Sequence, residues 1–277
     1  MKPVRRAAAL LLAAAMLAGC QTPRPVVPDT AAAAQAGVEV RQALAPTGVL
    51  RIAAYPGSPT SMVRRPDSDE VRGLSVEIGR ELALRLGVPT RVVEYERVEQ
   101  VVEAVRSAQA DVTITNATAA RAALVDFTEP LVMLELGYLV LPASPVAVIA
   151  DVDRAGIRVG VSQGSSSQAA LGRTYRNATL VAAPSLAAAA EMLRDRRIDA
   201  FATNKGILFQ LADGLPGARV LEGRWGTESL AIAVPKGREQ GKPWLERFAT
   251  SVRSQGLVKR AAEHAGLRGL ADDAQDR

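Results

Sequence analysis

Short apolar strands alternate with amphipathic helices along the chain, and this alternation restricts the possible folds more than any other feature. An apolar segment at Val49–Ala54 predicts a strand. In the predicted helix that follows, Leu74, Ile78 and Leu82 recur at four-residue spacing, as on the buried face of a helix. The pattern repeats as a strand over 91–95, a helix over 97–108 and a strand over 112–115. Helices between strands at this spacing are typical of βαβ units around a mainly parallel sheet, so we expect an α/β fold.

The same alternation continues after residue 130. Further strands are predicted over 136–141, 157–161, 180–182, 199–203 and 229–234. Helices are expected after the Ser162–Ser167 loop to about Arg176, over 185–196, and at the end over 243–254 and 255–265. The segment 143–155 contains Pro145 and little helical pattern, so we expect the chain to pass there into a second lobe.

Polar side chains follow the strand that ends at Thr115. Asn116 and Thr118 come directly after it, and Arg121 follows within a few residues. Ligands of open α/β sheets bind at the carboxyl ends of the strands. A guanidinium group can hold a carboxylate through two parallel hydrogen bonds. This segment therefore predicts a site for an anionic group.

A second polar loop, Ser162–Ser167, lies between a predicted strand and a helix. Gly164 can adopt a left-handed backbone, and Ser165 and Ser166 can cap the helix. Backbone N–H groups at such a helix start can bind an anion, although a well-capped helix explains the same residues. No Gly-Lys-Ser/Thr follows, so the loop is not a nucleotide-binding P-loop.

The segment Asp111–Pro130 resembles the signature of a known family. The matching residues are Thr118, Arg121, Val125, Asp126, Phe127, Thr128 and Pro130. They are similar to the pattern of the bacterial extracellular solute-binding proteins of family 3, the polar amino-acid receptors of ABC importers. Gly48–Ala53 also resembles the first strand of that family, and the resemblance spans roughly Pro46–Gly269.

The resemblance implies a two-lobe periplasmic binding protein fold of type II, with two crossings between the lobes and a ligand cleft at the hinge. Residues 46–142 and 231–277 are expected to form lobe 1, and 143–230 lobe 2. The expected function is capture of a small carboxylate-bearing solute, an amino acid or related compound, for an ABC permease acting in trans. The residues that the resemblance assigns to ligand binding are Arg121, Thr118 and Asn116 from lobe 1, and Gly164, Ser165, Ser166 and Asn204 from lobe 2.

Asn204 departs from the family pattern, in which an aspartate at this place pairs with the α-ammonium group of the ligand. A neutral amide gives no ion pair, and burying an unpaired ammonium group is costly. Either the ligand lacks an amino group, or another carboxylate supplies the charge. Glu135 and Glu228, near the two predicted crossings, are the candidates.

This chain also differs from the family pattern at the position of the aromatic residue that contacts the ligand. The family places an aromatic residue in the loop after the first strand, where it stacks on the ligand. That place falls near Ser58, with Tyr55 a few residues earlier. Tyr55 either stacks on the ligand or packs within the loop. Trp225 either lines the cleft or packs at the hinge.

The N-terminus predicts export and lipid anchoring. Met1–Cys20 has a basic start and an apolar run, and it ends in Leu-Ala-Gly-Cys, which resembles the lipobox of bacterial lipoproteins. An ordinary secretory signal with an incidental cysteine is the alternative. The expected protein is periplasmic and held to the membrane through Cys20. Residues 21–45, rich in Ala and Pro, are expected to form a tether.

Composition excludes other classes of function. The net charge is +5, but residues 1–19 carry three positive charges, so the mature chain is near +2. No basic stripe with interleaved aromatics supports nucleic-acid binding. Cys20 is the only cysteine and His264 the only histidine, so we expect no metal, no cofactor and no Cys/His catalysis. We expect a monomer that is not an enzyme. The alternative is a periplasmic lyase on the same scaffold, resembling cyclohexadienyl dehydratase, with a cleft carboxyl such as that of Glu135 as general acid.

Overall fold

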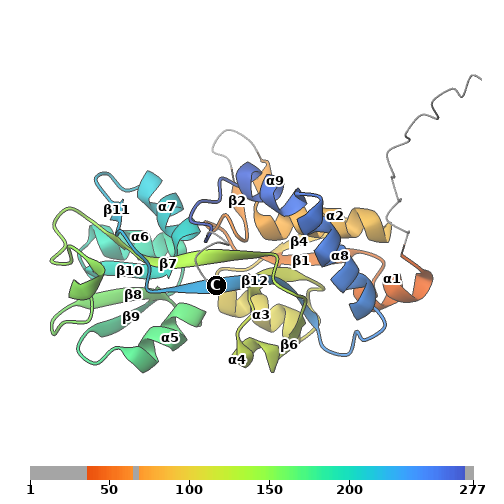
Figure 1. Ribbon diagram of the computed structural model, residues 1–277, viewed down its shortest axis with the longest axis horizontal. Coiled ribbons are helices and arrows are strands. Elements are labelled where there is room, and N and C mark those ends of the chain that lie inside the picture. Colours follow the sequence, from red (N-terminus) through yellow and green to blue (C-terminus); the bar gives the residue numbers. More distant parts are fainter. Residues whose placement is uncertain (1–35, 65–68, 272–277) are drawn as a thin grey trace, which may run out of the picture. The chain divides into compact units, whose positions relative to one another are not determined.

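The structure is a computed structural model that describes residues 36–64 and 69–271. Within these ranges the chain forms two α/β lobes that share two long strands (Figure 1). The long strands are β7 (Val132–Val140) and β12 (Gly226–Pro235). Lobe 1 consists of the elements before β7 and after β12, and lobe 2 of those between them. The predicted signal peptide with Cys20 lies outside the described residues, as does the first part of the predicted tether.

From residue 50 onwards, lobe 1 follows the predicted alternation of strands and helices. Its elements are α1 (Val38–Leu44), β1 (Leu50–Ala54), β2 (Val63–Arg64), β3 (Val71–Arg72), α2 (Leu74–Leu86), β4 (Thr90–Glu94), α3 (Val98–Arg106), β5 (Thr113–Asn116), α4 (Ala119–Ala122), β6 (Val125–Phe127), α8 (Lys242–Ser254) and α9 (Leu257–His264). β1 and β4 pair in parallel, with α2 between them in the chain. A parallel bridge between Ile52 and Val112 brings the start of β5 beside β1. These contacts form the predicted βαβ arrangement.

Lobe 2 repeats this arrangement. Its elements are η1 (Ile149–Asp151), β8 (Arg158–Ser162), α5 (Ser166–Thr174), β9 (Thr179–Ala183), α6 (Leu186–Arg194), β10 (Ala200–Asn204), α7 (Lys205–Asp213) and β11 (Arg219–Val220). β8 pairs in parallel with both β9 and β10. Gly160 on β8 leaves room for the side chain of Ile198, because a Cβ at residue 160 would lie 2.4 Å from that side chain. The buried rings of Tyr138 and Phe201 fill two clusters in this lobe.

β7 and β12 carry the chain between the lobes as antiparallel strands. Residues 132–136 of β7 pair with 230–226 of β12, and residues 136–139 pair with β10 of lobe 2. β12 in turn pairs with β5 and β6 of lobe 1. The strand order is β5-β12-β7-β10-β8-β9, so the expectation of a mainly parallel sheet holds only inside each lobe. The chain passes into lobe 2 within β7 instead of in segment 143–155, because continuous pairing keeps the backbone hydrogen-bonded across the hinge.

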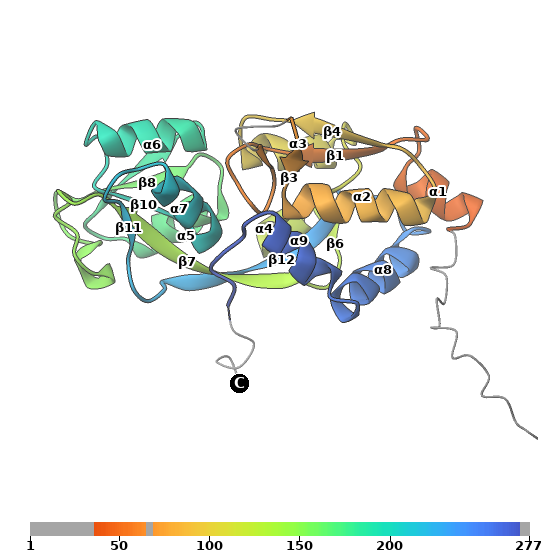
Figure 2. The ribbon, with the colours of Figure 1, turned by 90° about the horizontal axis from the view of Figure 1, so that it is seen from above.

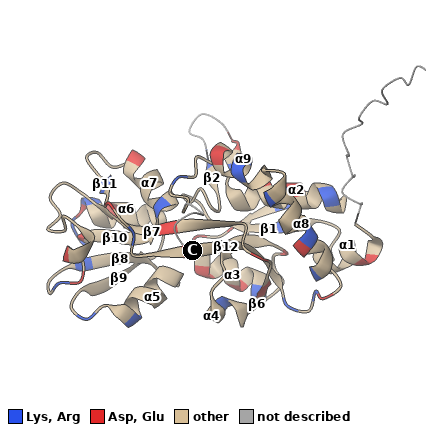
Figure 3. Cartoon of the chain, viewed as in Figure 1, with Lys and Arg blue, Asp and Glu red and all other residues tan. Residues whose placement is uncertain are grey.

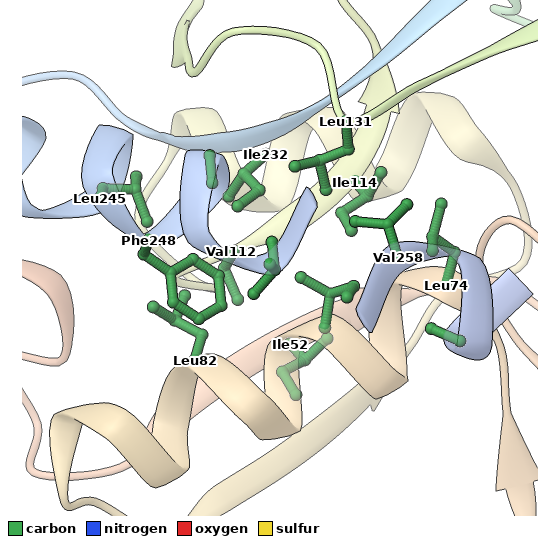
Figure 4. Close-up of a cluster of buried hydrophobic side chains, with 14 of the residues drawn as sticks. Ile52, Leu74, Leu82, Val112, Ile114, Leu131, Ile232, Leu245, Phe248 and Val258 are labelled. Atoms are coloured by element: carbon green, nitrogen blue, oxygen red, sulfur yellow. The ribbon is translucent and has the colours of Figure 1, made fainter. Parts of the chain in front are cut away.

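The main core of lobe 1 lies between the first sheet and the C-terminal helices. Figure 4 shows Ile52 and Val112 facing Leu82 of α2, Phe248 of α8 and Val258 of α9. Residues about 200 positions apart in the sequence therefore share one apolar cluster. This packing ties the C-terminal helices to lobe 1 and completes it, as the resemblance implies.

Helix α1 corrects the predicted tether. Residues 38–44 are helical instead of extended, and Leu44 is buried in the core of lobe 1. The guanidinium group of Arg238 donates to the carbonyl oxygens of Ala43 at 2.9 Å and Leu44 at 2.8 Å. These contacts involve a residue far along the chain, so they leave no local signal in the Ala-rich sequence. The folded domain starts before the expected Pro46.

A buried charge network stabilises the same part of lobe 1, around β1 and Arg238. Asp111 is fully buried and accepts hydrogen bonds from Arg51 Nε at 2.8 Å and from Arg238 Nη2 at 2.9 Å. Elsewhere along the chain, Lys and Arg are interspersed with Asp and Glu in both lobes (Figure 3). Exposed pairs such as Arg106–Glu103 contribute little to stability, whereas the Asp111 network fixes the position of β1 relative to the start of β5.

The segment after α9, residues 266–271, runs from lobe 1 towards α7 and β7 (Figure 2). Leu267 is buried in the core of lobe 1. Arg268 forms an ion pair with Asp213 on α7, and its guanidinium lies 5.0 Å from the centre of the Phe209 ring. The backbone of Glu135 on β7 donates to the carbonyl of Gly269 at 3.0 Å. We call residues 266–271 the C-terminal strap.

Candidate functional site

A small cavity of about 30 Å³ lies where the polar strand ends of the two lobes meet. Its polar lining comes from both lobes and from β12: Tyr55, Thr60, Thr115, Asn116, Arg121, Ser162, Ser165, Ser166, Ser167, Thr203, Asn204 and Glu228. Val98, Ile114, Ile207 and Leu230 complete the wall. A space of this size holds about one water molecule, so a larger guest requires the lobes or the side chains to move apart.

Arg121 is the cation of this cavity. Thr118 caps the short helix α4 by accepting a hydrogen bond from the Arg121 N–H at 3.2 Å, which directs the side chain inward. Arg121 Nη1 donates to Thr115 Oγ1 at 2.7 Å, and burial lowers the pKa of the guanidinium. Among the described residues the structure shows no salt bridge to Arg121. Its charge therefore faces the cavity with only neutral hydrogen-bond partners.

Asn116 connects the two lobes. Its Nδ2 donates to Ser166 Oγ on α5 at 3.1 Å, and its Oδ1 accepts from the backbone N–H of Ser229 at 3.2 Å. The amide thus joins β5, β12 and the first turn of α5. Asn116 and Ser166, both predicted as site residues, lie directly against each other.

The loop before α5 is built as a helix cap. Ser165 accepts a hydrogen bond from the Gln168 N–H at 3.1 Å, and Gly164 N–H donates to Gln168 Oε1 at 2.7 Å. Gly164 has a left-handed φ of 69°, and a Cβ there would lie 2.5 Å from Glu99 of α3. Ser165 and Ser166 line the cavity, whereas Gly164 lines a separate outer groove of about 560 Å³ that also reaches Arg121.

Asn204 and Glu228 also line the cavity. Asn204 caps α7, with Oδ1 accepting from the Ile207 N–H at 3.0 Å. This bond fixes the amide so that Nδ2 donates to Glu228 Oε1 at 2.8 Å. Glu228 is buried, and burial raises its pKa to about 7 against the opposing effects of Arg121 and of the Asn204 hydrogen bond. Within the described residues, no salt bridge reaches Glu228 either.

Glu135, the other candidate carboxylate, is paired elsewhere. It forms ion pairs with Lys205 and Arg224 and is not part of the cavity wall. Trp225 also lies away from the wall. Its Nε1 donates to the Gly137 carbonyl at 3.0 Å, and its ring is 6.2 Å from that of Tyr138, so it packs at the hinge. The structure does not bring these two predicted residues to the cavity.

The loop after β1 contributes Tyr55 and Thr60. Tyr55 lines the cavity, and burial raises the pKa of its hydroxyl, with a further increase from Glu228. Ser58 is fully buried behind this wall, with Oγ 2.8 Å from Thr60 Oγ1. Thr118 acts as a helix cap outside the wall. Ser58 and Thr118 therefore support the cavity without lining it.

Sequence reasoning missed Thr60, Thr115 and Thr203. Thr115 and Thr203 lie within β5 and β10, and strand prediction gives no signal for which face a threonine occupies. Both are one residue before a predicted polar site residue. Thr60 lies in a turn-rich loop whose path depends on contacts with α2, such as the Leu74 N–H to the Pro59 carbonyl at 2.9 Å.

Comparisons with known proteins agree on the class. The fold, with its cavity between two lobes, is that of a type II periplasmic binding protein. A family model described as bacterial extracellular solute-binding proteins, family 3, matches residues 50–265. The chain belongs to this family. A comparison with curated proteins found no match.

Solved structures with the same fold include several binding proteins. The solute receptor for L-cysteine of Neisseria gonorrhoeae is 24% identical, covers 85% of this chain and 100% of its own, and has a TM-score of 0.73. An amino acid ABC transporter substrate-binding protein from Streptococcus pneumoniae, bound to L-arginine, is 18% identical, covers 81% and 97%, and has a TM-score of 0.72. An ancestral amino acid-binding protein, a precursor of cyclohexadienyl dehydratase, is 20% identical, covers 79% and 96%, and has a TM-score of 0.69.

The described residues contain neither a candidate metal cluster nor a membrane-spanning helix. No group of three or more His, Cys, Asp or Glu residues in that part of the chain is placed to hold a metal ion. In the same residues, no helix has both the length and the apolar character needed to cross a bilayer.

Proposed function

We propose that this protein is the solute-binding component of an ABC importer and captures a small carboxylate-bearing solute, an amino acid or related compound, between its lobes. The observation that carries this proposal is the Arg121 guanidinium, buried at the cavity with only neutral partners. A buried cation that no described residue pairs in a salt bridge gains free energy when an anion joins it, because the anion compensates for lost hydration.

Ligand binding and lobe closure are one process in this account. The Arg121 fork from lobe 1 holds the ligand carboxylate, and Ser165 and Ser166 at the start of α5 approach it from lobe 2. The Asn116–Ser166 hydrogen bond then closes across the ligand. Because groups from both lobes serve one ligand, the closed state gains contacts that the open state lacks. A permease acting in trans recognises the closed form. An acylated Cys20 holds the protein at the membrane in the periplasm.

The proposal is tested by thermal unfolding of the purified protein against amino acids, opines and deaminated carboxylates. A ligand present at 100 times its dissociation constant adds about 2.7 kcal/mol to the free energy of unfolding, which is a readily measured shift. The expected result is a shift with at least one carboxylate that is lost in Arg121→Ala. Arg106→Ala, which removes an exposed arginine on α3, is the matched control and keeps the shift. No shift with any carboxylate would overturn the proposal.

Glu228 supports a second candidate function. Its pKa of about 7 leaves a mixture of acid and carboxylate near neutral pH, as a general acid requires. A lyase in this cleft would use Arg121 to hold the substrate carboxylate and Glu228 to protonate the leaving group. The test follows a bound ligand by NMR over hours. Slow consumption that stops in Glu228→Gln favours the lyase, and an unchanged ligand favours the receptor.

A further inference from the structure

We propose that a second pocket, on lobe 2, binds a phosphomonoester, with Arg194 and Arg196 holding the phosphate and apolar side chains holding the organic group. The pocket has a volume of about 370 Å³ and lies between the loop 141–144, the start of β8 and the residues between α6 and β10. We call it the lobe 2 pocket. The cavity between the lobes lies at the opposite ends of β8 and β10. The two sites are therefore separate, and this inference does not rest on the proposed function of the cavity.

The two lobes contain the same structural unit, so one can be compared with the other. α6 begins and ends 88 positions after α3, and the strands that follow these helices, β10 and β5, both end in an asparagine at the same spacing. The Arg51–Asp111 pair of lobe 1 recurs in lobe 2 as Arg158–Asp199, in which Nε donates to the carboxylate at 2.8 Å and 3.1 Å respectively. Lobe 1 therefore shows how the charges of this unit can be arranged.

In lobe 1 the arginines at this end of the unit have carboxylate partners. Arg106, in the last turn of α3, forms an ion pair with Glu103 at 2.6 Å. Arg238, beyond the end of β12, donates to Asp111 at 2.9 Å, and Arg51 donates to the same carboxylate. The charges of these arginines are thus balanced within the chain.

In lobe 2 the arginine at the end of the helix lacks such a partner. Arg194 and Glu191 occupy the positions that Arg106 and Glu103 have in lobe 1. Arg194 Nη2 donates instead to the backbone carbonyl of Gly214 at 3.4 Å. Among the described residues, no carboxylate forms an ion pair with Arg194, although it lines the lobe 2 pocket.

Arg196 adds a cation that lobe 1 does not have at this place. It occupies the position of Ala108, and both residues have a left-handed φ of 54°. The backbone turn is therefore the same in the two lobes, and only the side chain differs. The Arg196 guanidinium lines the pocket and forms no hydrogen bond or ion pair with any residue that the structure describes. Both Arg194 and Arg196 can consequently donate to a ligand.

The lobe 2 pocket is open because a serine takes the place of an arginine. By the register of the paired strands, Ser144 beyond β7 corresponds to Arg238 beyond β12. Ser144 Oγ donates to the backbone carbonyl of Asp199 at 2.6 Å and does not cover its carboxylate. The Asp199 side chain keeps 12% of its surface exposed, against 0% for Asp111. The serine thus leaves free the volume that a guanidinium group occupies in lobe 1.

The charge of the pocket indicates the ligand's anionic group. The charged residues of the lining are Arg158, Arg194, Arg196 and Asp199, which give a net charge of +2. A phosphomonoester carries a charge of about −1.5 to −2 at pH 7, and guanidinium forks match the geometry of its oxygens. A single carboxylate would balance only half of the pocket's charge.

The apolar part of the wall indicates that the phosphate is attached to an organic group. This part consists of Leu141, Pro142, Leu193 and Ile198. Inorganic phosphate would leave these side chains in contact with water, whereas an aromatic or aliphatic group on the ester removes apolar surface from water. The lobe 2 pocket therefore favours phosphomonoesters over free phosphate.

Calorimetric titration of the purified protein at pH 8 tests the inference. The probes are phenyl phosphate, inorganic phosphate and phenol. We expect phenyl phosphate to bind, inorganic phosphate to bind at least about tenfold more weakly, and phenol not to bind. The affinity for phenyl phosphate is expected to fall at pH 5, because the second pKa of a phosphomonoester is about 6 and the dianion is then lost. Vesicles that contain phosphatidic acid distinguish the source of the ester: competition with phenyl phosphate assigns a lipid head group, and no competition assigns a soluble compound.

Variants locate the binding to the lobe 2 pocket. Arg196→Gly removes the guanidinium at a backbone conformation that glycine favours, so the fold is expected to be retained. We expect it to weaken phenyl phosphate binding about tenfold, because hydrogen bonds to charged groups are lost. Ala108→Gly makes the matched change in lobe 1 and is expected to bind as the wild type does. Arg194→Ala is expected to weaken binding in the same way, with Arg106→Ala as its unchanged control.

The contradicting results are equally specific. No binding of phenyl phosphate to the wild type, or wild-type affinity in both Arg196→Gly and Arg194→Ala, would overturn the inference. Equal affinities for inorganic phosphate and phenyl phosphate would overturn the assignment to phosphomonoesters. Loss of binding in Arg121→Ala would place the phosphate in the cavity between the lobes and would overturn a separate site.

Discussion

The side-chain amide of Asn116 at the end of β5 donates to the hydroxyl of Ser166 in the first turn of α5 at 3.1 Å. This is a direct bond between the lobes at the wall of the cavity. In our account it forms when the lobes close, so it contributes to ligand affinity more than to the stability of either lobe.

Ser166→Ala is therefore expected to weaken ligand binding several-fold, because one net hydrogen bond contributes about 1 kcal/mol to the closed state. The melting temperature without ligand is expected to change little. Ser254→Ala is the control, since its hydroxyl bonds only within α8, to the Ser251 carbonyl at 3.1 Å. Equal affinity for the ligand in Ser166→Ala and the wild type would show that this bond does not stabilise the closed state.

The burial of Glu228 in the arrangement of the lobes that the structure shows predicts a pH dependence of stability. Its pKa is about 7 in the folded protein, above the reference value of 4.5. The folded protein therefore binds more protons between these values. The stability that Glu228 contributes is fully present below pH 4.5 and is lost as pH rises through about 7. One pKa unit corresponds to about 1.4 kcal/mol, so the total is a few kcal/mol at most.

Urea unfolding from pH 5 to pH 8 measures this effect. Glu228→Gln is expected to flatten the decrease and to be more stable than the wild type at pH 8. Glu222→Gln, which changes an exposed glutamate, is expected to follow the wild type. The same decrease in Glu228→Gln and the wild type would assign the titration to another group.

Asp111→Asn is expected to destabilise the protein by about 3–5 kcal/mol. The carboxylate accepts from Arg51 and Arg238 while fully buried, and an amide would turn an NH₂ group towards one of these guanidinium groups. Denaturant unfolding measures the loss. Asp195→Asn at an exposed ion pair is expected to have less than about 1 kcal/mol of effect. A loss of similar size in both variants would contradict a special role for the buried network.

Gly269→Ala is expected to weaken ligand binding although residue 269 does not line the cavity. A Cβ there would lie 2.4 Å from Lys205 Cβ, in the first turn of α7 that Asn204 caps. The clash would displace this turn and, through Asn204, the carboxylate of Glu228. Titration with the ligand found in the thermal panel measures the change.

Gly266→Ala separates this clash from backbone strain. Both glycines have left-handed φ angles, 67° at Gly266 and 77° at Gly269, but a Cβ at Gly266 meets nothing within 4 Å. Both variants are expected to lose similar stability from strain, and only Gly269→Ala is expected to lose affinity. Equal affinity in the two variants would exclude coupling between the C-terminal strap and the site.

The strand and helix pattern could be predicted well because local periodicity reports it. The helix over 74–86 and the strand before Arg121 were expected close to where they occur. The hinge could not be placed, because β7 continues from one lobe to the other without any local signal at Leu136. Helix α1 was missed because Leu44 and Arg238, 194 positions apart, stabilise it together.

The candidate site was predictable only in part. Motif resemblance singled out Arg121, Asn116 and Asn204, which the structure brings to one cavity. Glu135 and Glu228 were equivalent in sequence, because both lie beside a lobe crossing. Only the three-dimensional structure distinguishes them. Lys205 pairs with Glu135, whereas Glu228 lies near Arg121. The lobe boundaries and the roles of the site residues both depend on such long-range contacts.

The most direct test of the account is calorimetric titration of the amino acid that most stabilises the protein, with the wild type and with Arg121→Lys. The variant keeps the positive charge but loses the planar fork of donors. We predict that affinity falls by at least about 30-fold in Arg121→Lys. Arg106→Lys, on the exposed face of α3, is expected to bind as the wild type does. Unchanged affinity in Arg121→Lys would contradict the claim that this arginine holds the ligand carboxylate.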